Sequence, residues 1–569
     1  MLDFTIKTDA NGQEYLETSM TGKALLSVSQ LNKGTAFTPE ERHTFKLMGK
    51  LPNKVETLDE QVHRAYLQYQ SFDKQINRNT LLNSILDVNQ VLFYRLVQDH
   101  MKEMIPTLYT PVVGNVVQTF SEKFMNPRGL YIAYPDRDHI EAILDNRSNP
   151  NIQLIVVSDG EGVLGIGDQG IGAMAIPVAK LMVYTAFAGI NPLNTLPILL
   201  DAGTNNETLL QDPLYLGWAH RRLAGDQYGD FIDQFIHAVK KKFPHVFLHW
   251  EDFGRTNAYR NLIKYRQAMC SFNDDIQGTG VVTTAAVLAA VKKTPVPLAD
   301  QRIVIYGAGT AGMGVVDNLC RAFCQLGLQR EAVKKQFWLI DKSGLLTVHS
   351  TDITPSQQPY LRTAEEIQTW SVKNKQSISL LEVVKHVKPT LLIGTSAQGG
   401  AFTQPIVETM ARYVERPIIF PLSNPTEKCE ADPTQLLQWT QGQALIATGS
   451  PFEDVQYQAH SITISQCNNY LAFPGIGLGV IAIQAQRVTD NMLLAASGAL
   501  AHATPTDHHA LLPSIEEAPS VSKQIAISVA EAAIQENVAG IAIDQPVEKI
   551  INNTMWKPHY LPYRKQPQG

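Results

Sequence analysis

The chain has few of the features that mark secreted proteins or metal–thiolate sites. Only 5 cysteines occur among 569 residues, and no two of them form a Cys-x-x-Cys pair. Scarce cysteines without such a pattern are typical of a reducing compartment and exclude a dense disulfide framework. Cys320 and Cys324 lie one helical turn apart, and we interpret them as buried small apolar side chains.

Long hydrophobic runs and an excess of positive charge are also missing. The longest apolar stretch, near Val281–Val291, is too short and too rich in Thr and Ala to cross about 30 Å of hydrocarbon. The first residues, Met1–Gly12, have neither the basic start and apolar core of a secretory signal nor the Arg-rich pattern of a transit peptide. With 48 Lys and Arg against 54 Asp and Glu, the chain offers no broad basic face. We therefore expect a cytoplasmic protein without a membrane or nucleic-acid partner.

The composition that remains is that of a globular protein of several domains. Hydrophobic residues make up 44% and charged residues 18%, and the length predicts about three or four domains. Up to about residue 125, apolar residues recur at helical spacing over 40–47, 60–70 and 80–100. Thr38-Pro39-Glu40-Glu41 has the pattern of a helix start: a cap, a proline in the first turn and acids near the positive end of the dipole.

From Gly129 onward the pattern changes to short apolar runs that end in acids and glycines. Runs at 153–157, 196–200 and 247–250 alternate with helical segments, which is the signature of a parallel sheet. A Pro-containing boundary at 292–299 precedes a second such block, with runs at 302–306, 337–340, 390–393, 417–420 and 444–447. Ligand-binding residues of such folds gather at the carboxyl ends of the strands.

The predicted fold class is therefore α/β, with a helical N-terminal domain, a parallel-sheet domain for substrate and metal, and a Rossmann-type NAD-binding domain. We place the helical domain at 1–127, the substrate and metal domain at 128–278 plus 464–537, the NAD-binding domain at 279–463 and a C-terminal tail at 538–569.

A dinucleotide site is predicted where the strand 303–306 runs into G-x-G-x-x-G. Gly307 permits a tight turn, Gly309 lets backbone N–H groups approach a pyrophosphate, and Gly312 lets helix and strand pack closely. The next strand ends in Asp341, an acid that suits the ribose hydroxyls of NAD and repels the 2′-phosphate of NADP. The predicted cofactor loop comprises Gly307, Ala308, Gly309, Thr310, Ala311 and Gly312.

A second G-x-G-x-x-G match, at 165–170, is a decoy. Asp168 would place a carboxylate where the pyrophosphate must sit. We interpret this segment as a turn at which the backbone comes close to something else, such as substrate.

Acidic residues suggest a divalent metal site. Glu251 and Asp252 end one strand, and Asn273-Asp274-Asp275 lies in a later loop. An all-oxygen cluster suits Mg²⁺ or Mn²⁺, although paired acids at loop ends are more often simply solvated.

Several further residues have both a functional and an ordinary interpretation. Lys180 lies in a nearly apolar stretch and is either a general base or a lysine whose head reaches solvent. Tyr109 precedes Thr110-Pro111 and by itself is a turn tyrosine. Asn424 and the pair Asn468 and Asn469 have turn or cap roles by default, yet they fall where a cleft would lie.

Taken together, these motifs resemble the malic enzyme family, which includes the malolactic enzymes. The resemblance runs from Asn32 to about Trp556. Its most specific segments are Tyr109-Thr110-Pro111, Gly165–Asp168, Glu251-Asp252-Phe253, Phe272–Thr279, Ser423-Asn424-Pro425 and Phe473-Pro474-Gly475.

The resemblance implies a role for each candidate. Lys180 would be the general base and Tyr109 the general acid. Glu251, Asp252 and Asp275 would bind the divalent ion, Mg²⁺ or Mn²⁺, and Asp274 would support them. Asn424, Asn468 and Asn469 would contact L-malate, with Asn424 also at the nicotinamide. The implied reaction is NAD-linked oxidative decarboxylation of L-malate to pyruvate and CO₂ by a homodimer or homotetramer.

One position departs from the family pattern. Malic enzymes typically carry Arg where this chain has Gly162, and malolactic enzymes resemble the chain there. Malolactic conversion of malate to lactate and CO₂ with tightly held NAD is therefore the alternative. We hypothesise that Arg255, just after Glu251-Asp252-Phe253-Gly254, partly replaces the missing guanidinium.

Overall fold

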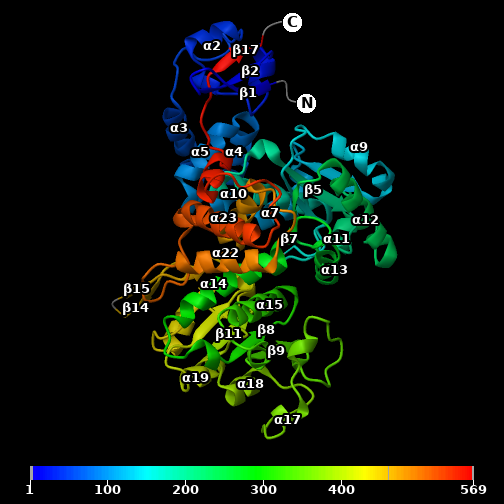
Figure 1. The fold of residues 1–569 in the computed structure, drawn as a ribbon, viewed down its shortest axis with the longest axis vertical. Helices are drawn as coiled ribbons and strands as arrows, with labels where there is room; N and C mark the ends of the chain where they lie inside the picture. Colours follow the sequence, from blue (N-terminus) through cyan, green and yellow to red (C-terminus); the bar gives the residue numbers. More distant parts are fainter. Residues whose placement is uncertain (1–3, 164, 459, 567–569) are drawn as a thin grey trace.

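The computed structural model describes residues 4–163, 165–458 and 460–566. Figure 1 shows three units stacked along the long axis: the N-terminal segments at one end, the first parallel sheet in the middle and the second sheet at the other end. The two chain termini lie at the same end.

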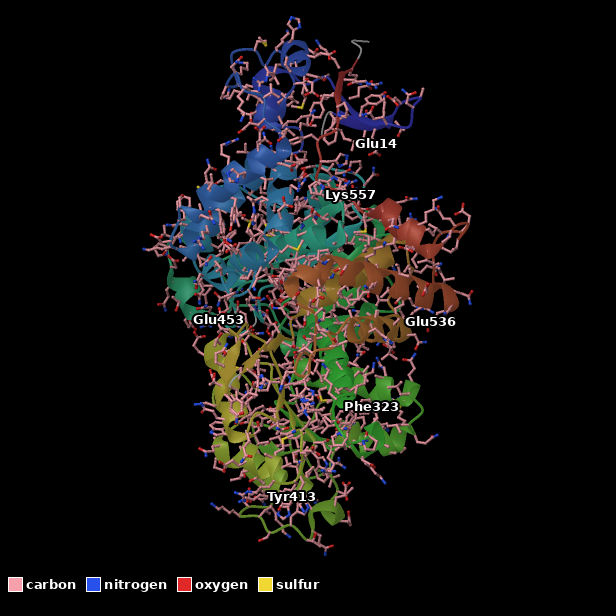
Figure 2. All side chains as sticks on the ribbon, turned by 90° about the vertical axis from the view of Figure 1, so that its left-hand side faces the viewer. Glu14, Phe323, Tyr413, Glu453, Glu536 and Lys557 are labelled. Carbon is pink, nitrogen blue, oxygen red and sulfur yellow. The ribbon has the colours of Figure 1, made fainter. Side chains whose placement is uncertain are left out.

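The N-terminal unit is helical as predicted, but it begins with a β-hairpin. Strands β1 (Phe4–Thr8) and β2 (Glu14–Thr18) are antiparallel, and the strand β17 (Tyr563–Lys565) pairs with β2 in parallel. In Figure 2 the C-terminal segment passes Lys557 and rises beside the hairpin that carries Glu14. Residues Tyr563–Lys565 therefore belong to the N-terminal sheet, although 538–569 was predicted to be a C-terminal tail. The helices are α1 (Gly22–Leu26), α2 (Pro39–Thr44), α3 (Leu58–Gln70), α4 (Gln75–Val88), α5 (Gln90–Asp99), α6 (Met101–Leu108), α7 (Val113–Gln118) and α8 (Phe120–Lys123).

Local signals determine where these helices begin. Thr38 caps α2, as the sequence predicted, and it forms a reciprocal capping box with Glu41. Asn89 ends α4 and caps α5 through Leu92, which divides the predicted helix 80–100 into two.

The middle unit contains the first parallel sheet, with strand order β3-β5-β4-β6-β7. The strands are β3 (Leu130–Ala133), β4 (Leu154–Ser158), β5 (Thr195–Asp201), β6 (Phe247–Trp250) and β7 (Ser271–Asn273). All of their pairings are parallel, so their carboxyl ends share one edge. The helices of this unit are α9 (Ile140–Asp145), α10 (Ala175–Ala188), α11 (Glu207–Gln211), α12 (Gly225–Lys242) and α13 (Arg255–Tyr265).

The third unit has the strand order β10-β9-β8-β11-β12-β13-β16. Its order reverses between β8 and β11, which is where doubly wound sheets bind ligands. The strands are β8 (Ile303–Tyr306), β9 (Phe337–Asp341), β10 (Gly344–Leu345), β11 (Leu391–Gly394), β12 (Ile418–Pro421), β13 (Leu445–Thr448) and β16 (Ser465–Gln466), beside the hairpin β14 (Val455–Tyr457) and β15 (His460–Ile462). The helices are α14 (Thr279–Val291), α15 (Thr310–Gln325), α16 (Arg330–Lys334), α17 (Ala364–Ile367), α18 (Leu380–Val387), α19 (Gln404–Ala411) and α20 (Pro433–Trp439). Because β16 belongs to this sheet, the unit extends slightly past the predicted end at 463.

Late helices join the two sheets. Helices α21 (Phe473–Ala482) and α23 (Ala518–Gln535) pack on α10 of the middle unit, while α22 (Asp490–His502) packs on α14. Helix α24 (Val547–Thr554) packs on α21 and α23. One apolar core consequently runs through both units.

The longest apolar helical segment is not the one expected near Val281–Val291. In the described part of the chain, one helical segment, Gly170–Ala188, is long and apolar enough to cross a membrane by length and composition. Of its most apolar 18 residues, 94% are buried inside the protein, so this segment is a core helix.

Candidate active site

The middle of α10 holds a fully buried lysine among carboxylates. Lys180 is 1% exposed, and its Nζ lies 3.0 Å from Glu251 Oε1 and in direct contact with Asp274 Oδ2. Burial alone would lower the pKa of Lys180, but the two carboxylates outweigh it and hold the pKa well above its ordinary value. The ordinary interpretation, a lysine whose head reaches solvent, is excluded by this burial.

Tyr109 lies next to this ammonium group at the end of α6. The lysine Nζ is 5.4 Å from the centroid of the Tyr109 ring and 4.4 Å from that of Phe473. Tyr109 is 7% exposed, and burial raises the pKa of its hydroxyl. The structure therefore brings the predicted base and the predicted acid together from separate helices.

Three carboxylates at the end of the first sheet form a compact oxygen cluster. Ligand atoms of Glu251, Asp252 and Asp275 lie within 4.8 Å of one another, and all three residues are buried. Asp275 Oδ2 accepts from the backbone N–H of Asp252 (2.9 Å), while Asp275 Oδ1 has no hydrogen-bond partner among the described residues. Burial and the charges of Glu251 and Asp274 raise the pKa of Asp275 well above its ordinary value. Glu251 and Asp274 pair with the Lys180 ammonium group, and Glu251 also belongs to the buried set with Asp252 and Asp275. This set of carboxylate donors fits a hard divalent cation.

A series of side-chain hydrogen bonds, not predicted from the sequence, connects Glu251 to His249 and Tyr184. His249 is fully buried on β6; its Nε2 lies 2.7 Å from Glu251 Oε2, and its Nδ1 lies 2.7 Å from the hydroxyl of Tyr184. Burial lowers the pKa of His249 to about 3, so the ring is neutral. A neutral ring that accepts from Tyr184 at Nδ1 can donate from Nε2 to the carboxylate. The only sequence signal was the alternation that points His249 and Glu251 to one face of the strand.

The three predicted asparagines have different hydrogen-bond partners, and two of them contact residues at or next to this centre. Asn469 Nδ2 donates to Asp274 Oδ2 (3.0 Å), and Asn468 Nδ2 donates to Thr110 Oγ1 (3.2 Å), next to Tyr109. Asn424 follows β12 and accepts from Ser450 Oγ at 2.6 Å. Asn469 thus orients Asp274 directly.

The glycine loop after β8 has the geometry of a phosphate cradle. Gly307 has a φ of +100°, and a Cβ there would lie 2.6 Å from the backbone of Ser396. A Cβ on Gly312 would lie 2.3 Å from the carbonyl oxygen of Gly307, whereas one on Gly309 would meet nothing within 4 Å. Gly309 therefore faces open space at the start of α15, where backbone N–H groups can hold an anion, and the loop fits a dinucleotide.

Arg255 points toward this loop. Its NH2 lies 3.6 Å from Asp341 Oδ2 and 3.5 Å from the carbonyl oxygen of Ala308. Asp341 is the last residue of β9, where the sequence predicted an acid. Its role at the ribose hydroxyls stays a prediction. Arg255 therefore reaches residues of the predicted dinucleotide site. These contacts do not support the hypothesis that Arg255 replaces the missing guanidinium at the malate carboxylate.

The decoy segment is a structural turn, as its acid indicated. Asp168 forms an ion pair with Arg222 at 2.7 Å and accepts from the backbone N–H of Asn205 at 2.8 Å. A Cβ on Gly165 would lie 2.5 Å from the carbonyl oxygen of Asn424. The turn at Gly165 therefore packs directly against the backbone of Asn424, just after β12.

The departure at Gly162 has a steric basis in this chain. Its N–H donates to the carbonyl oxygen of Asp252 at 2.9 Å, and a Cβ would lie 2.7 Å from the carbonyl oxygen of Phe253. Any side chain at this position would displace the loop that carries two of the clustered acids.

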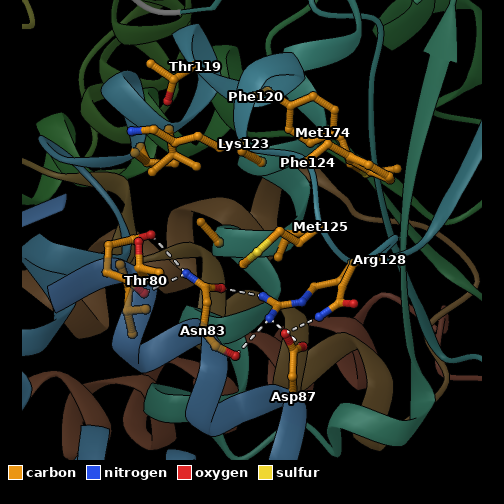
Figure 3. A pocket seen from close by; sticks show the side chains of 18 of the residues that line it. Thr80, Asn83, Asp87, Thr119, Phe120, Lys123, Phe124, Met125, Arg128 and Met174 are labelled. Carbon is orange, nitrogen blue, oxygen red and sulfur yellow. Dashed lines mark hydrogen bonds and ion pairs between the residues drawn. The ribbon is translucent and has the colours of Figure 1, made fainter. Parts of the chain in front are cut away.

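A separate cavity of about 180 Å³ lies against α10 (Figure 3). Ala175, Val178 and Met182 line it, and they occupy the face of α10 opposite Lys180 because helical positions repeat every 3.6 residues. At its rim Arg128 pairs with Asp87 at 2.6 Å. This cavity is therefore distinct from the cluster around Lys180.

Comparisons with known proteins agree with this geometry. Residues 86–266 match the family model described as the malic enzyme N-terminal domain, and residues 276–534 match the malic enzyme NAD-binding domain. The chain is 46% identical over 566 residues to the NAD-dependent malic enzyme of Acinetobacter baylyi, covering 99% of this chain and 100% of that protein. It is 45% identical over 558 residues to the NAD-dependent malic enzyme of Aliivibrio fischeri, covering 98% and 99%.

Solved structures show the same fold. The crystal structure of Entamoeba histolytica malic enzyme has 23% identity and a TM-score of 0.56, covering 90% of each chain. A malic enzyme from Pyrococcus horikoshii has 23% identity and a TM-score of 0.54, covering 80% of this chain and 88% of that one.

Fold and site together define an α/β protein with two large, mainly parallel sheets, a glycine loop that fits a dinucleotide, and a buried cluster of a lysine and carboxylates. With full-length relatives at 46% identity, the chain belongs to the malic enzyme family.

Proposed function

We propose that this protein is an NAD-dependent malic enzyme: L-malate and NAD⁺ give pyruvate, CO₂ and NADH. The observation that carries the proposal is the position of Lys180, buried between Glu251 and Asp274 beside the hydroxyl-bearing Tyr109. The names of the full-length relatives support the same activity.

Two groups that the chain does not supply have matching sites. Glu251, Asp252 and Asp275 would hold Mg²⁺ or Mn²⁺, which supplies Lewis acidity toward the hydroxyl and carboxylate oxygens of malate. The loop from Gly307 to Gly312, with Asp341, would hold NAD, which supplies the hydride acceptor.

The chain's own residues move the protons. Lys180 takes the proton of the C2 hydroxyl as hydride leaves, and the later loss of CO₂ leaves C3 in need of a proton, which Tyr109 donates from its neutral hydroxyl. Lys180 acts as a base only from its neutral form. Because Asp274 and Glu251 hold its pKa high, Glu251 must turn to another partner before Lys180 can release its proton. Asn469 keeps Asp274 in place through this exchange.

Substrate and cofactor contacts follow from position. Asn468 and Asn469 lie at the lysine centre and would bind malate, and Asn424 would contact malate and the nicotinamide at the end of β12.

We further propose that the protein is a homodimer or homotetramer and that it is located in the cytoplasm. Light scattering coupled to gel filtration tests the oligomeric state, and cell fractionation tests the location.

The direct test combines enzyme, L-malate, NAD⁺ and Mn²⁺, follows NADH by absorbance, and measures pyruvate, lactate and CO₂ at the end. We expect NADH and pyruvate in equal amounts. Lactate with little free NADH would overturn the proposal in favour of malolactic conversion. Oxaloacetate without CO₂ would indicate a simple dehydrogenase.

A further inference from the structure

A fully buried carboxylate lies at the carboxyl end of the second sheet, and the proposed reaction does not use it. Glu430 belongs to the segment between β12 and α20. A Cβ on Gly394, the last residue of β11, would lie 2.5 Å from the Cδ of Glu430, so the carboxylate packs directly against the end of that strand. Burying a carboxylate is costly unless hydrogen bonds replace the lost water. Its partners therefore indicate what it holds in place.

Two serines from two different loops supply these hydrogen bonds. Glu430 Oε1 accepts from the backbone N–H and the hydroxyl of Ser396, both at 2.8 Å, and from the hydroxyl of Ser423 at 2.6 Å. Glu430 Oε2 accepts from the backbone N–H of Ser423 at 3.2 Å. The hydroxyl of Ser423 also accepts from the N–H of Ala397 at 2.8 Å. Because Ser396 follows β11 and Ser423 follows β12, Glu430 sets the spacing of the loops after two neighbouring strands.

Both loops adjoin residues of the predicted cofactor site. A Cβ on Gly307, the first glycine of the dinucleotide loop, would lie 2.6 Å from the backbone of Ser396. Ser423 directly precedes Asn424, the residue proposed to contact malate and the nicotinamide. Glu430 thus connects the backbone that packs against the glycine loop with the backbone that carries Asn424.

The strand order indicates which half of a dinucleotide these loops face. Strands β9, β8 and β11 lie side by side (Figure 1), and β12 follows β11. Asp341 at the end of β9 is the predicted partner of the adenosine ribose, and the loop after β8 is the predicted pyrophosphate site. A dinucleotide that crosses the loop after β8 from Asp341 therefore has its nicotinamide half over the ends of β11 and β12.

We propose that Glu430 is a positioning residue for the nicotinamide half of NAD, acting through Ser396 and Ser423. This inference rests on the proposed function, because it assumes that NAD is the cofactor. The Glu430 carboxylate does not touch the cofactor; it holds the two loops at the spacing that the nicotinamide half requires. The adenosine half depends on Asp341 and the glycine loop instead.

The test compares NADH with ADP in the full-length protein, because ADP carries the adenosine and both phosphates but lacks the nicotinamide half. Glu430→Gln keeps the shape of the side chain but replaces one acceptor oxygen by an NH₂ group, which then faces a donor of Ser396 or Ser423. We expect the NADH dissociation constant, measured by NADH fluorescence, to rise by about tenfold. The dissociation constant of ADP, measured by its displacement of NADH, should stay unchanged.

Glu427→Gln is the matched control, because it makes the same change at an exposed glutamate three residues earlier. It should leave both dissociation constants unchanged. Ser423→Ala removes one hydroxyl of the network and should also weaken NADH more than ADP, so it tests the same connection if Glu430→Gln does not fold.

Normal NADH affinity in Glu430→Gln and Ser423→Ala would overturn the positioning role. An equal loss of affinity for NADH and ADP would also overturn it, because a merely structural role weakens both halves of the site alike. If the parent protein does not bind NADH, the proposed function fails and this inference fails with it, whereas a parent that binds NADH separates the two.

Discussion

At the scale of single residues, the chemistry depends on one lysine that is held as a cation. Lys180→Arg keeps a positive charge between Glu251 and Asp274, but a guanidinium cannot give up its proton. We expect kcat to fall by about 10²–10⁴-fold, with NADH affinity unchanged. Steady-state NADH formation and NADH fluorescence measure the two effects. An arginine variant with near-normal kcat would show that Lys180 is not the base.

His249 should tune metal binding through Glu251. In His249→Phe the Glu251 carboxylate loses its hydrogen bond, and outer partners of metal ligands typically contribute about 10–100-fold in affinity. We expect Mn²⁺ binding, measured by titration calorimetry without substrate, to weaken to that extent. His249→Gln retains an N–H donor and serves as the control, with a smaller loss expected. Equal Mn²⁺ affinity in both variants and the parent would refute this role.

Asp159 should make stability depend on pH. It is buried beside Arg222 and accepts from the Tyr228 hydroxyl at 2.5 Å, and burial raises its pKa from 3.8 to about 6. Between about pH 4 and 6 the folded state therefore binds more protons than the unfolded state, so this group lowers stability as the pH rises. Asp159→Asn removes this pH dependence. The Tm of the variant minus that of the parent should therefore rise from pH 4 to 6 and stay constant at higher pH. The exposed Asp226→Asn, on the same helix as Tyr228, should show no such trend in thermal melts.

At the scale of elements, two glycines of one loop should respond differently to the same change. Gly309→Ala places a methyl group in open space at the dinucleotide cradle, so NADH affinity should fall with Tm unchanged. Gly312→Ala places it 2.3 Å from the Gly307 carbonyl oxygen, so Tm should fall by several degrees. NADH fluorescence and thermal melts distinguish the two. A stability loss in Gly309→Ala would contradict the open cradle.

At the scale of the whole molecule, the C-terminal segment should stabilise the N-terminal unit. The Tyr563 ring packs edge-on against Phe37 and Phe45, and Tyr560 donates to Gln61 at 2.6 Å. Deleting 557–569 should lower the first thermal transition, by about 2–4 °C per kcal/mol lost, while NADH affinity stays normal. Tyr563→Ala should give part of that effect. Unchanged melting of the deletion variant would show that β17 contributes nothing to this unit.

Much of the fold could be predicted from local pattern. The strand Phe247–Trp250 has the predicted bounds, and β8 and β9 differ by one residue from their predictions. Short apolar runs flanked by acids and glycines specify such strands through neighbouring residues alone. Strand β17 lay outside this reach, because it pairs with β2, a segment more than 500 residues away. The hairpin β1–β2 is local, but its short, mainly exposed strands lack the buried apolar runs on which the strand predictions relied.

For the candidate site, the residue types could be read from the sequence alone: the glycine loop, Asp341, the acids at the strand ends, and Lys180 in an apolar helix. Tertiary structure decided what they touch. The contact of Lys180 with Asp274 joins residues 94 positions apart, and the His249–Tyr184 pair and the direction of Arg255 follow from how the elements pack. The physical reason is range: backbone preferences act over a few residues, whereas burial, ion pairing and pKa depend on groups that only the folded core brings together.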